Sequence, residues 1–256
     1  MSMSTTRQHI GKQHLHLPET DSTNNRAAEL AKNPANAGAV VTAGVQTRGR
    51  GQYGRVWQSQ PDTNVLMSVL LFPPPELRHP AILTAFAAVV VGEMVLQITG
   101  QQTSIKWPND VLFKGKKICG ILIESGVHRH GADSPQHFIV GIGLNVNQTA
   151  EDFAAQELPD ACSLAMMVGR RLTVSAITEA LLDNLDSEYG RLLAGEIAPL
   201  EACWKWRMGL LGKPVTVELM DGTEHGGRLR DMGFETVELE DRSFKSVEVR
   251  HVRSHG

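Results

Sequence analysis

The sequence predicts an α+β protein with a large domain over residues 18–208 and a small β domain over residues 209–256. Three observations lead to this prediction. Short apolar runs typical of strands recur between helical patterns throughout the large domain. Near the end of the large domain, the apolar residues of 174–193 have the spacing of a long helix. From Lys213 onward the pattern changes to short alternating runs separated by polar turns. That change predicts a β-barrel of under about fifty residues, which needs a neighbouring domain for stability.

The first third of the chain contains a helix and two strands. Residues 1–17 are polar, include three histidines and lack the apolar core of a signal peptide, so they are expected to form a flexible tail. Residues 21–24, Asp-Ser-Thr-Asn, are preferred helix N-caps and predict a helix that ends before Pro34. The apolar residues 39–43 and 65–71 predict two strands.

The remaining elements follow from their patterns. Residues 81–96 are apolar but short for a membrane span and contain Glu93, which favours a buried helix. Further strands are expected at residues 104–107, 111–113, 118–124 and 138–146, with the second and third forming a hairpin, and a short helix is expected at 200–208. The alternating runs of the small domain are residues 215–219, 226–229, 236–239 and 244–247.

Composition narrows the classes of function. A net charge of −3 over 256 residues gives no bulk attraction to nucleic acid or to membranes. Cys119, Cys162 and Cys203 are odd in number and far apart, without a C-x-x-C pair. They are expected to be reduced thiols in a cytoplasmic protein.

The most informative segment is residues 46–57, between the first two strands. Gly49, Gly51 and Gly54 match the dinucleotide-binding pattern G-x-G-x-x-G, but a strand follows instead of the helix that this pattern needs. A Walker A loop is excluded because Arg50-Gly51 stands where Lys-Ser/Thr is required. What remains is a glycine-rich loop with arginines suited to phosphate or carboxylate. A solvated basic loop is the alternative that this segment alone leaves open.

Four other polar residues are candidates for chemistry. Lys117 directly precedes an apolar strand, so its ammonium lies at the rim of a core, where it can pair strongly with an anion. Asn109 and Asp110 follow Trp107-Pro108 and are either turn residues or contacts to a ribose, magnesium ion or amine. Asn145 sits in an apolar strand, where a buried amide needs partners.

These residues form motifs that resemble the biotin protein ligase family. The motifs occur in order as Ser22-Thr23-Asn24; Gly49 to Arg55 with Trp57; residues 106–110 with Lys117, Gly120 and Glu124; and residues 141–146. The resemblance spans roughly residues 18–250. It implies a catalytic domain related to class II aminoacyl-tRNA synthetases, with a mixed sheet and flanking helices, followed by an SH3-like barrel. Many relatives carry a preceding DNA-binding domain; the residues before Ser22 are too few for one, so no nucleic-acid partner is expected.

The implied reaction forms biotinyl-AMP from biotin and ATP, with magnesium, and then transfers biotin to a lysine of a biotin carboxyl carrier protein. By resemblance, Lys117, Arg50 and Asp110 are catalytic, with Asp110 orienting or deprotonating the acceptor amine. The implied biotin-binding residues are Ser22, Thr23, Asn24, Gln46, Gly49, Arg50, Lys117 and Gly120. The implied nucleotide-binding residues are Arg50, Gln52, Tyr53, Arg55, Trp57, Asn109 and Asn145. Magnesium is expected to arrive with ATP near Asn109 and Asp110, without a cage of protein ligands. A homodimer is possible.

One position departs from the family's pattern. Relatives often carry a second arginine where this chain has Gln52, which can donate a hydrogen bond but no charge-assisted, bidentate one. Looser retention of biotinyl-AMP is therefore expected. Three alternatives stay open: lipoate or octanoate transfer on the same fold, a sensor that binds biotin without catalysis, and an RNA binder that stacks Tyr53 on bases.

Overall fold

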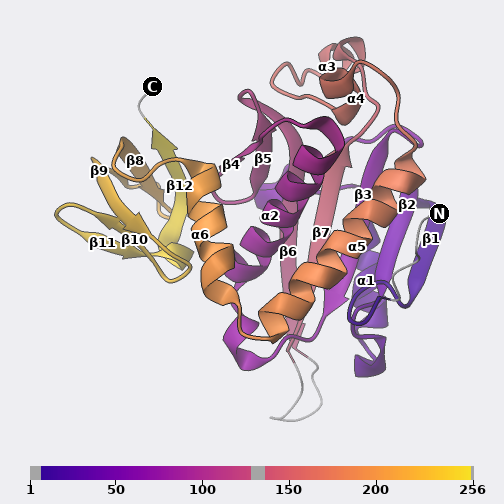
Figure 1. The fold of residues 1–256 in the computed structure, drawn as a ribbon, viewed down its shortest axis with the longest axis horizontal. Helices are drawn as coiled ribbons and strands as arrows, with labels where there is room; N and C mark the ends of the chain where they lie inside the picture. Colours follow the sequence, from indigo (N-terminus) through magenta and orange to yellow (C-terminus); the bar gives the residue numbers. More distant parts are fainter. Residues whose placement is uncertain (1–6, 128–135, 255–256) are drawn as a thin grey trace.

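A seven-stranded mixed sheet forms the centre of the large domain (Figure 1). The computed structural model describes residues 7–127 and 136–254. The strand order is β1-β2-β3-β7-β6-β5-β4, and β1 is parallel to β2 while the other pairs are antiparallel. The strands are β1 (His14–Thr20), β2 (Val40–Gln46), β3 (Asn64–Leu71), β4 (Ser104–Lys106), β5 (Asp110–Phe113), β6 (Lys116–Val127) and β7 (Gln136–Asn145).

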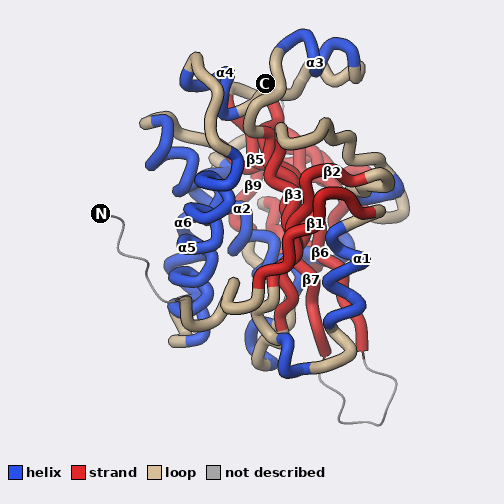
Figure 2. The backbone as a smooth tube through the Cα atoms, turned by 90° about the vertical axis from the view of Figure 1, so that its right-hand side faces the viewer, coloured by secondary structure: helices blue, strands red, loops and turns tan. Residues whose placement is uncertain are grey.

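Helices cover both faces of this sheet, as Figure 2 shows. One face is covered by α1 (Thr23–Leu30), and the other by α2 (Pro80–Thr99) and α5 (Val174–Leu193). Next to α2 lies α6 (Ile197–Met208), which leads into the small domain. Two short helices, α3 (Ala150–Ala155) and α4 (Leu164–Val168), lie between β7 and α5 along the chain.

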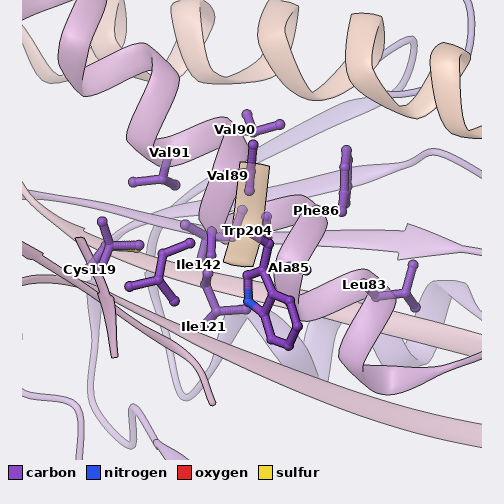
Figure 3. Packing of buried hydrophobic residues seen from close by; sticks show 14 of the residues in the cluster. Leu83, Ala85, Phe86, Val89, Val90, Val91, Cys119, Ile121, Ile142 and Trp204 are labelled. Atoms are coloured by element: carbon purple, nitrogen blue, oxygen red, sulfur yellow. The ribbon is translucent and has the colours of Figure 1, made fainter. Parts of the chain in front are cut away.

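The main core lies between the sheet and α2. This helix is apolar on nearly all sides and therefore packs against β6 and β7, α5 and α6 at once. Figure 3 shows Phe86 and Val90 of α2 in one cluster with Ile121, Ile142 and Trp204. By length and composition α2 is the single described helix that could cross a membrane, but 72% of its most apolar window is buried inside the protein. The predicted buried helix is confirmed.

The C-terminal domain is a five-stranded antiparallel sheet of order β11-β10-β9-β8-β12. Its strands are β8 (Pro214–Leu219), β9 (Glu224–Met232), β10 (Thr236–Leu239), β11 (Ser243–Lys245) and β12 (Val249–Ser254). An aromatic row fixes it to the large domain, since Trp204 of α6 lies 5.6 Å from Trp107 and 5.2 Å from Phe234 between ring centroids. The predicted fold class is confirmed; the strand β12 was not predicted.

Two local predictions differ from the structure. Part of the expected flexible tail is held in place. Strand β1 begins at His14 and pairs with β2, and Arg7 forms ion pairs with Glu179 and Asp183 on α5. The sequence of β1, HLHLPET, has only two apolar residues before a proline, and most of its side chains are exposed, so the pattern gives a weak strand signal. The N-cap cluster does precede a helix, but Ser22 makes no side-chain capping hydrogen bond. The side chains of Thr23 and Asn24 form hydrogen bonds in the cleft described below instead.

Candidate active site

A cleft of about 650 Å³ opens between the central sheet, the glycine-rich loop and the C-terminal domain. It is lined by every residue that the sequence assigned to the site except Gly49. Gly49 lies at the base of the loop, where an added Cβ would be 2.5 Å from the carbonyl oxygen of Trp57 and 3.0 Å from Nε2 of Gln46. It therefore allows a close backbone approach and offers no binding group to the cleft.

The floor of the cleft is made of glycines on β6 and β7. Gly120 and Gly143 are cross-strand partners, and the indole of Trp57 lies on both. A Cβ on Gly143 would lie 2.6 Å from two indole atoms, and one on Gly120 would lie 2.9 Å from the same ring. Side chains at these two positions would displace Trp57, so the glycines make room for an aromatic ring above the sheet.

A network of neutral polar groups closes one end of the cleft. The backbone N–H of Thr23 donates to Oε1 of Gln46 at 2.7 Å, and the Thr23 hydroxyl lies 3.1 Å from the same oxygen. Ser68 of β3, which is fully buried, places its hydroxyl 2.7 Å from Oγ1 of Thr23 and 2.5 Å from Oδ1 of Asn24. These amides and hydroxyls can bind an uncharged polar head group through hydrogen bonds.

Arg50 is held by a carboxylate from the sheet. Its Nε and terminal nitrogen donate to the two oxygens of Glu124 at 2.8 and 2.7 Å, and Asn24 also donates to Glu124 at 2.8 Å. Burial opposes ionisation of Glu124, but the hydrogen bonds from Arg50 and Asn24 outweigh it and lower the pKa of this carboxyl. The same pair raises the pKa of Arg50. The chain Asn24–Glu124–Arg50 therefore links helix α1, strand β6 and the loop.

Lys117 brings a second cation to the same cleft. Its Nζ forms an ion pair with Asp110 across the β5–β6 hairpin at 2.6 Å and lies 5.7 Å from the ring centroid of Trp57. Its backbone is fixed by the segment 160–162, since the Lys117 N–H donates to the carbonyl of Asp160 and its carbonyl accepts from Cys162. The position of Lys117 is thus set by the sheet.

Asn145 and Asn109 serve the framework around the two cations. Asn145 is 5% exposed and donates to the carbonyl of Cys162 at 3.1 Å, while its Oδ1 accepts from Asn64 at 3.1 Å. Asn109 donates to the carbonyl of Ile121 at 2.7 Å and accepts from the Ile121 N–H through its own backbone. Both amides brace the strands that carry Lys117 and Gly120.

The glycine-rich loop is a small hairpin. Arg50 and Val56 form an antiparallel bridge, and the Trp57 N–H donates to the carbonyl of Gly49 at 3.0 Å. Gln52, Tyr53 and Gly54 form its tip, and Gln52 and Arg55 line the cleft. The ring of Tyr53, expected beside the nucleotide, is directed toward His251 of the C-terminal domain, with 6.2 Å between ring centroids.

Several residues of the site were not singled out from the sequence. Ser68 and Asn64 look like ordinary strand residues, and only their polarity inside buried runs hints at a role. Glu124 belongs to a motif quoted above, but its partner Arg50 is 74 positions away. The cleft is also lined by His251, Val252 and Arg253 of β12, which no local pattern connects to the loop.

Comparison with known proteins identifies the family. Residues 17–145 match the Biotin/lipoate A/B protein ligase family. The bifunctional ligase/repressor BirA of Bacillus subtilis is 34% identical over 220 residues, which cover 86% of this chain and 67% of that protein. The biotin–[acetyl-CoA-carboxylase] ligase of Paracoccus denitrificans is 34% identical over 218 residues, covering 82% of this chain and 87% of the relative. The chain belongs to the biotin protein ligase family.

The fold of a solved biotin protein ligase agrees with this assignment. The biotin protein ligase from Aquifex aeolicus in complex with biotin and ATP has a TM-score of 0.77 and 28% sequence identity, covering 96% of this chain and 100% of that chain. The superposition therefore includes the C-terminal domain of this biotin protein ligase family member as well as its central sheet.

Proposed function

We propose that this cleft joins biotin to AMP, with release of pyrophosphate, and then transfers biotin to a lysine of a biotin carboxyl carrier domain. The observation that carries the proposal is the pair of cations, Arg50 and Lys117, which line the same cleft as the glycine floor. Two anions must meet in the first step, the carboxylate of biotin and the α-phosphate of ATP. Fixed cations in a partly buried cleft lower the repulsion between them.

In the first step, a carboxylate oxygen of biotin bonds to the α-phosphorus of ATP, and the bond from that phosphorus to the pyrophosphate oxygen breaks. Lys117 and Arg50 stabilise the charge on the phosphorus oxygens and the carboxylate. Both cations are paired with carboxylates in the free protein, Asp110 and Glu124 respectively. The carboxylates therefore orient the cations before the ligands bind. The ligand anions then replace these carboxylates or bind the cations beside them.

In the second step, the amine nitrogen of the acceptor lysine attacks the carbonyl carbon of biotinyl-AMP and AMP leaves with the bonding electrons. The amine must lose a proton, and we assign Asp110 to orient it or accept that proton. A covalent intermediate on the enzyme is not required, because AMP is already a good leaving group. Cys119 does not serve as a nucleophile, since its burial raises the pKa of the thiol.

Magnesium would enter with ATP. Groups of three or more metal-ligating side chains do not occur within residues 7–127 and 136–254. The carboxylate of Asp110 and the amide oxygen of Asn109 are the hard oxygen donors that magnesium accepts, and it commonly takes few protein ligands beside phosphates. When bound, the ion would offset phosphate charge, while Lys117 and Arg50 hold the reacting groups.

Biotin is favoured over lipoate by the relatives. The family name covers both, but the relatives at 34% identity carry names of biotin ligases or of a ligase/repressor. The neutral end of the cleft, lined by Thr23 and Gln46, offers hydrogen bonds to a polar ring system. A dithiolane ring has no comparable donors or acceptors, so lipoate would gain no hydrogen bonds at this end.

The cellular setting follows from the same proposal. The acceptor is a carrier domain of a biotin-dependent carboxylase, and we propose that this protein meets it in the cytoplasm. All three cysteines are free, which suits a reducing compartment. The proposed reaction requires no nucleic acid, and a homodimer is compatible with it.

The proposed function is tested by the first half-reaction. The protein is incubated with ATP, magnesium and biotin, and biotinyl-AMP is measured by mass spectrometry after denaturation. Lipoate and a reaction without ATP serve as controls. We expect biotinyl-AMP in the complete reaction only. Tight biotin binding without the adenylate would instead support a sensor, and lipoyl-AMP would support the sister activity.

A further inference from the structure

The C-terminal domain contacts the glycine-rich loop at its tip. Arg250 lies over the ring of Tyr53, with 4.9 Å from the guanidinium carbon to the ring centroid. His251 meets the same ring edge-on, at an interplanar angle of 71°. The Tyr53 hydroxyl lies 3.9 Å from the sulfur of Met220, which directly follows β8. One aromatic side chain of the large domain thus touches three residues of the small one.

At the tip of the loop, Tyr53 has these contacts with the C-terminal domain, whereas residues 54–56 are open to solvent. A Cβ at the adjacent Gly54 would meet open space, and Val56 is 74% exposed. Tyr53 also has φ of 58° and ψ of 35°, the left-handed region that costs free energy for a residue with a side chain. A tyrosine keeps such a conformation where contacts of its side chain compensate for it. The ring contacts with Arg250 and His251 supply that compensation.

Arg250 is itself anchored within the small domain. Its guanidinium lies 3.5 Å from Oε1 of Glu218, whose side chain is 14% exposed. Glu218 is on β8 and Arg250 is on β12, so the contact spans two paired strands. The surface that receives Tyr53 is therefore part of the sheet of the small domain.

The other end of the loop carries the groups that face the cleft. The hairpin is short, with the Gly51 N–H donating to the carbonyl of Arg55 at 2.7 Å and a bridge between Arg50 and Val56. Arg50 and Trp57 are at the base of the hairpin. Arg50 binds the Glu124 carboxylate, and the indole of Trp57 packs on the glycine floor. Displacement of the tip would move both groups, because few residues separate them from Tyr53.

We propose that Arg250 and His251 are positioning residues, which act through Tyr53 to hold the glycine-rich loop over the cleft. The small domain thereby contributes to adenylation and to retention of biotinyl-AMP through the contact of these two residues with the loop. The role in catalysis rests on the function proposed above; the contact itself does not.

The test compares hydrogen exchange of residues 49–57 in the free protein. Tyr53→Ala removes the ring but keeps the strained backbone, since alanine is disfavoured at positive φ as well. We expect exchange in this segment to become about three to ten times faster, the range expected for a lost cation–π contact and its neighbours. Tyr53→Phe keeps the ring and is expected to restore slow exchange. Arg250→Ala should accelerate exchange in the same segment to a smaller extent, because the His251 contact remains, and the double variant should not exceed Tyr53→Ala.

Arg242→Ala is the matched control. Arg242 is an arginine of the same domain whose contacts are to Asp241 and His225, away from the loop. It should leave exchange in residues 49–57 unchanged, and exchange of β8 and β12 reports whether each variant keeps the small domain folded. Unchanged exchange in Tyr53→Ala would overturn the proposal. A double variant whose increase in exchange rate equals the product of the two single increases would overturn it as well.

A kinetic readout then separates positioning from folding. We expect Tyr53→Ala to raise the dissociation rate of biotinyl-AMP and the KM for ATP by about threefold to tenfold, with Tyr53→Phe close to the parent. Faster exchange with unchanged kinetics would overturn the positioning role. Absence of adenylation in the parent protein would contradict the proposed function instead, while the exchange result would still decide on the contact.

Discussion

The two cations of the cleft are held in different ways. Lys117 stands on a hairpin of the central sheet, with backbone hydrogen bonds to residues 160 and 162 and support from the buried amide of Asn145 nearby. Arg50 stands on a loop whose tip is mostly exposed and whose fixed points are the Glu124 carboxylate and the Tyr53 contact. The sheet half of the site is built before any ligand arrives, whereas the loop half depends on a few side-chain contacts. Changes on the sheet side are therefore expected to affect chemistry, and changes on the loop side to affect ligand retention.

The largest effect is expected from Lys117→Ala. Lys117→Ala removes a fixed cation from the negative charge that develops in the transition state. Removal of one such preorganised contact typically lowers a rate by about a hundredfold or more, and we expect this for adenylation. The rate of biotinyl-AMP formation measures it. Lys116→Ala removes the neighbouring, exposed lysine and should leave the rate near that of the parent. Near-normal turnover in Lys117→Ala would contradict the role in adenylation that we assign to this residue.

The glycine floor should be nearly as sensitive. In Gly143→Ala the new methyl group would lie 2.6 Å from the indole of Trp57, so the ring must move. Overpacking of this kind costs about 1–3 kcal/mol, and we expect the Kd for biotin and ATP to rise about tenfold or more by calorimetry. Gly226→Ala on β9, where an added Cβ meets open space, is the matched control. Equal affinities in the two variants would show that Trp57 does not depend on the floor.

The Arg50–Glu124 pair predicts an effect of pH on stability. The pKa of Glu124 is lowered in the folded protein, because hydrogen bonds from Arg50 and Asn24 outweigh the effect of burial. Its stabilising contribution is therefore full above the unfolded pKa of about 4.3 and is lost as pH falls through the lower folded value. Glu124→Gln should lower Tm near neutral pH, and the difference from the parent should shrink below about pH 4. A difference independent of pH would contradict this account.

The smallest effect is expected at Gln52, on the loop half. Gln52→Arg adds a cation at the mouth of the cleft, and a charge-assisted hydrogen bond exceeds a neutral one by on the order of 1 kcal/mol. We expect the dissociation of biotinyl-AMP to slow by about fivefold. A rate that stays the same or increases would show that this position does not contact the intermediate.

Much of this architecture could be predicted from the sequence, and the difference between the two halves explains what could not. The strand at β7 and the helix α2 are marked by long apolar runs, and the motifs around Lys117 and Gly120 are local. Glu124 and Ser68 were given no role because their partners, Arg50 and Asn24, lie in distant parts of the chain. The contact of Tyr53 with Arg250 joins residues almost two hundred positions apart, and it depends on how the two domains pack. Strand β1 was missed because it is an exposed edge strand with only two apolar residues before a proline.

The central claim is that this protein attaches biotin to a carrier. The most direct test is the intact mass of a biotin carboxyl carrier domain after incubation with this protein, ATP, magnesium and biotin, with lipoate in parallel. We predict a mass gain of one biotin that requires ATP and disappears when the acceptor lysine is replaced. An unchanged carrier mass under conditions in which a known biotin ligase modifies the same carrier, or a gain with lipoate in place of biotin, would contradict the account.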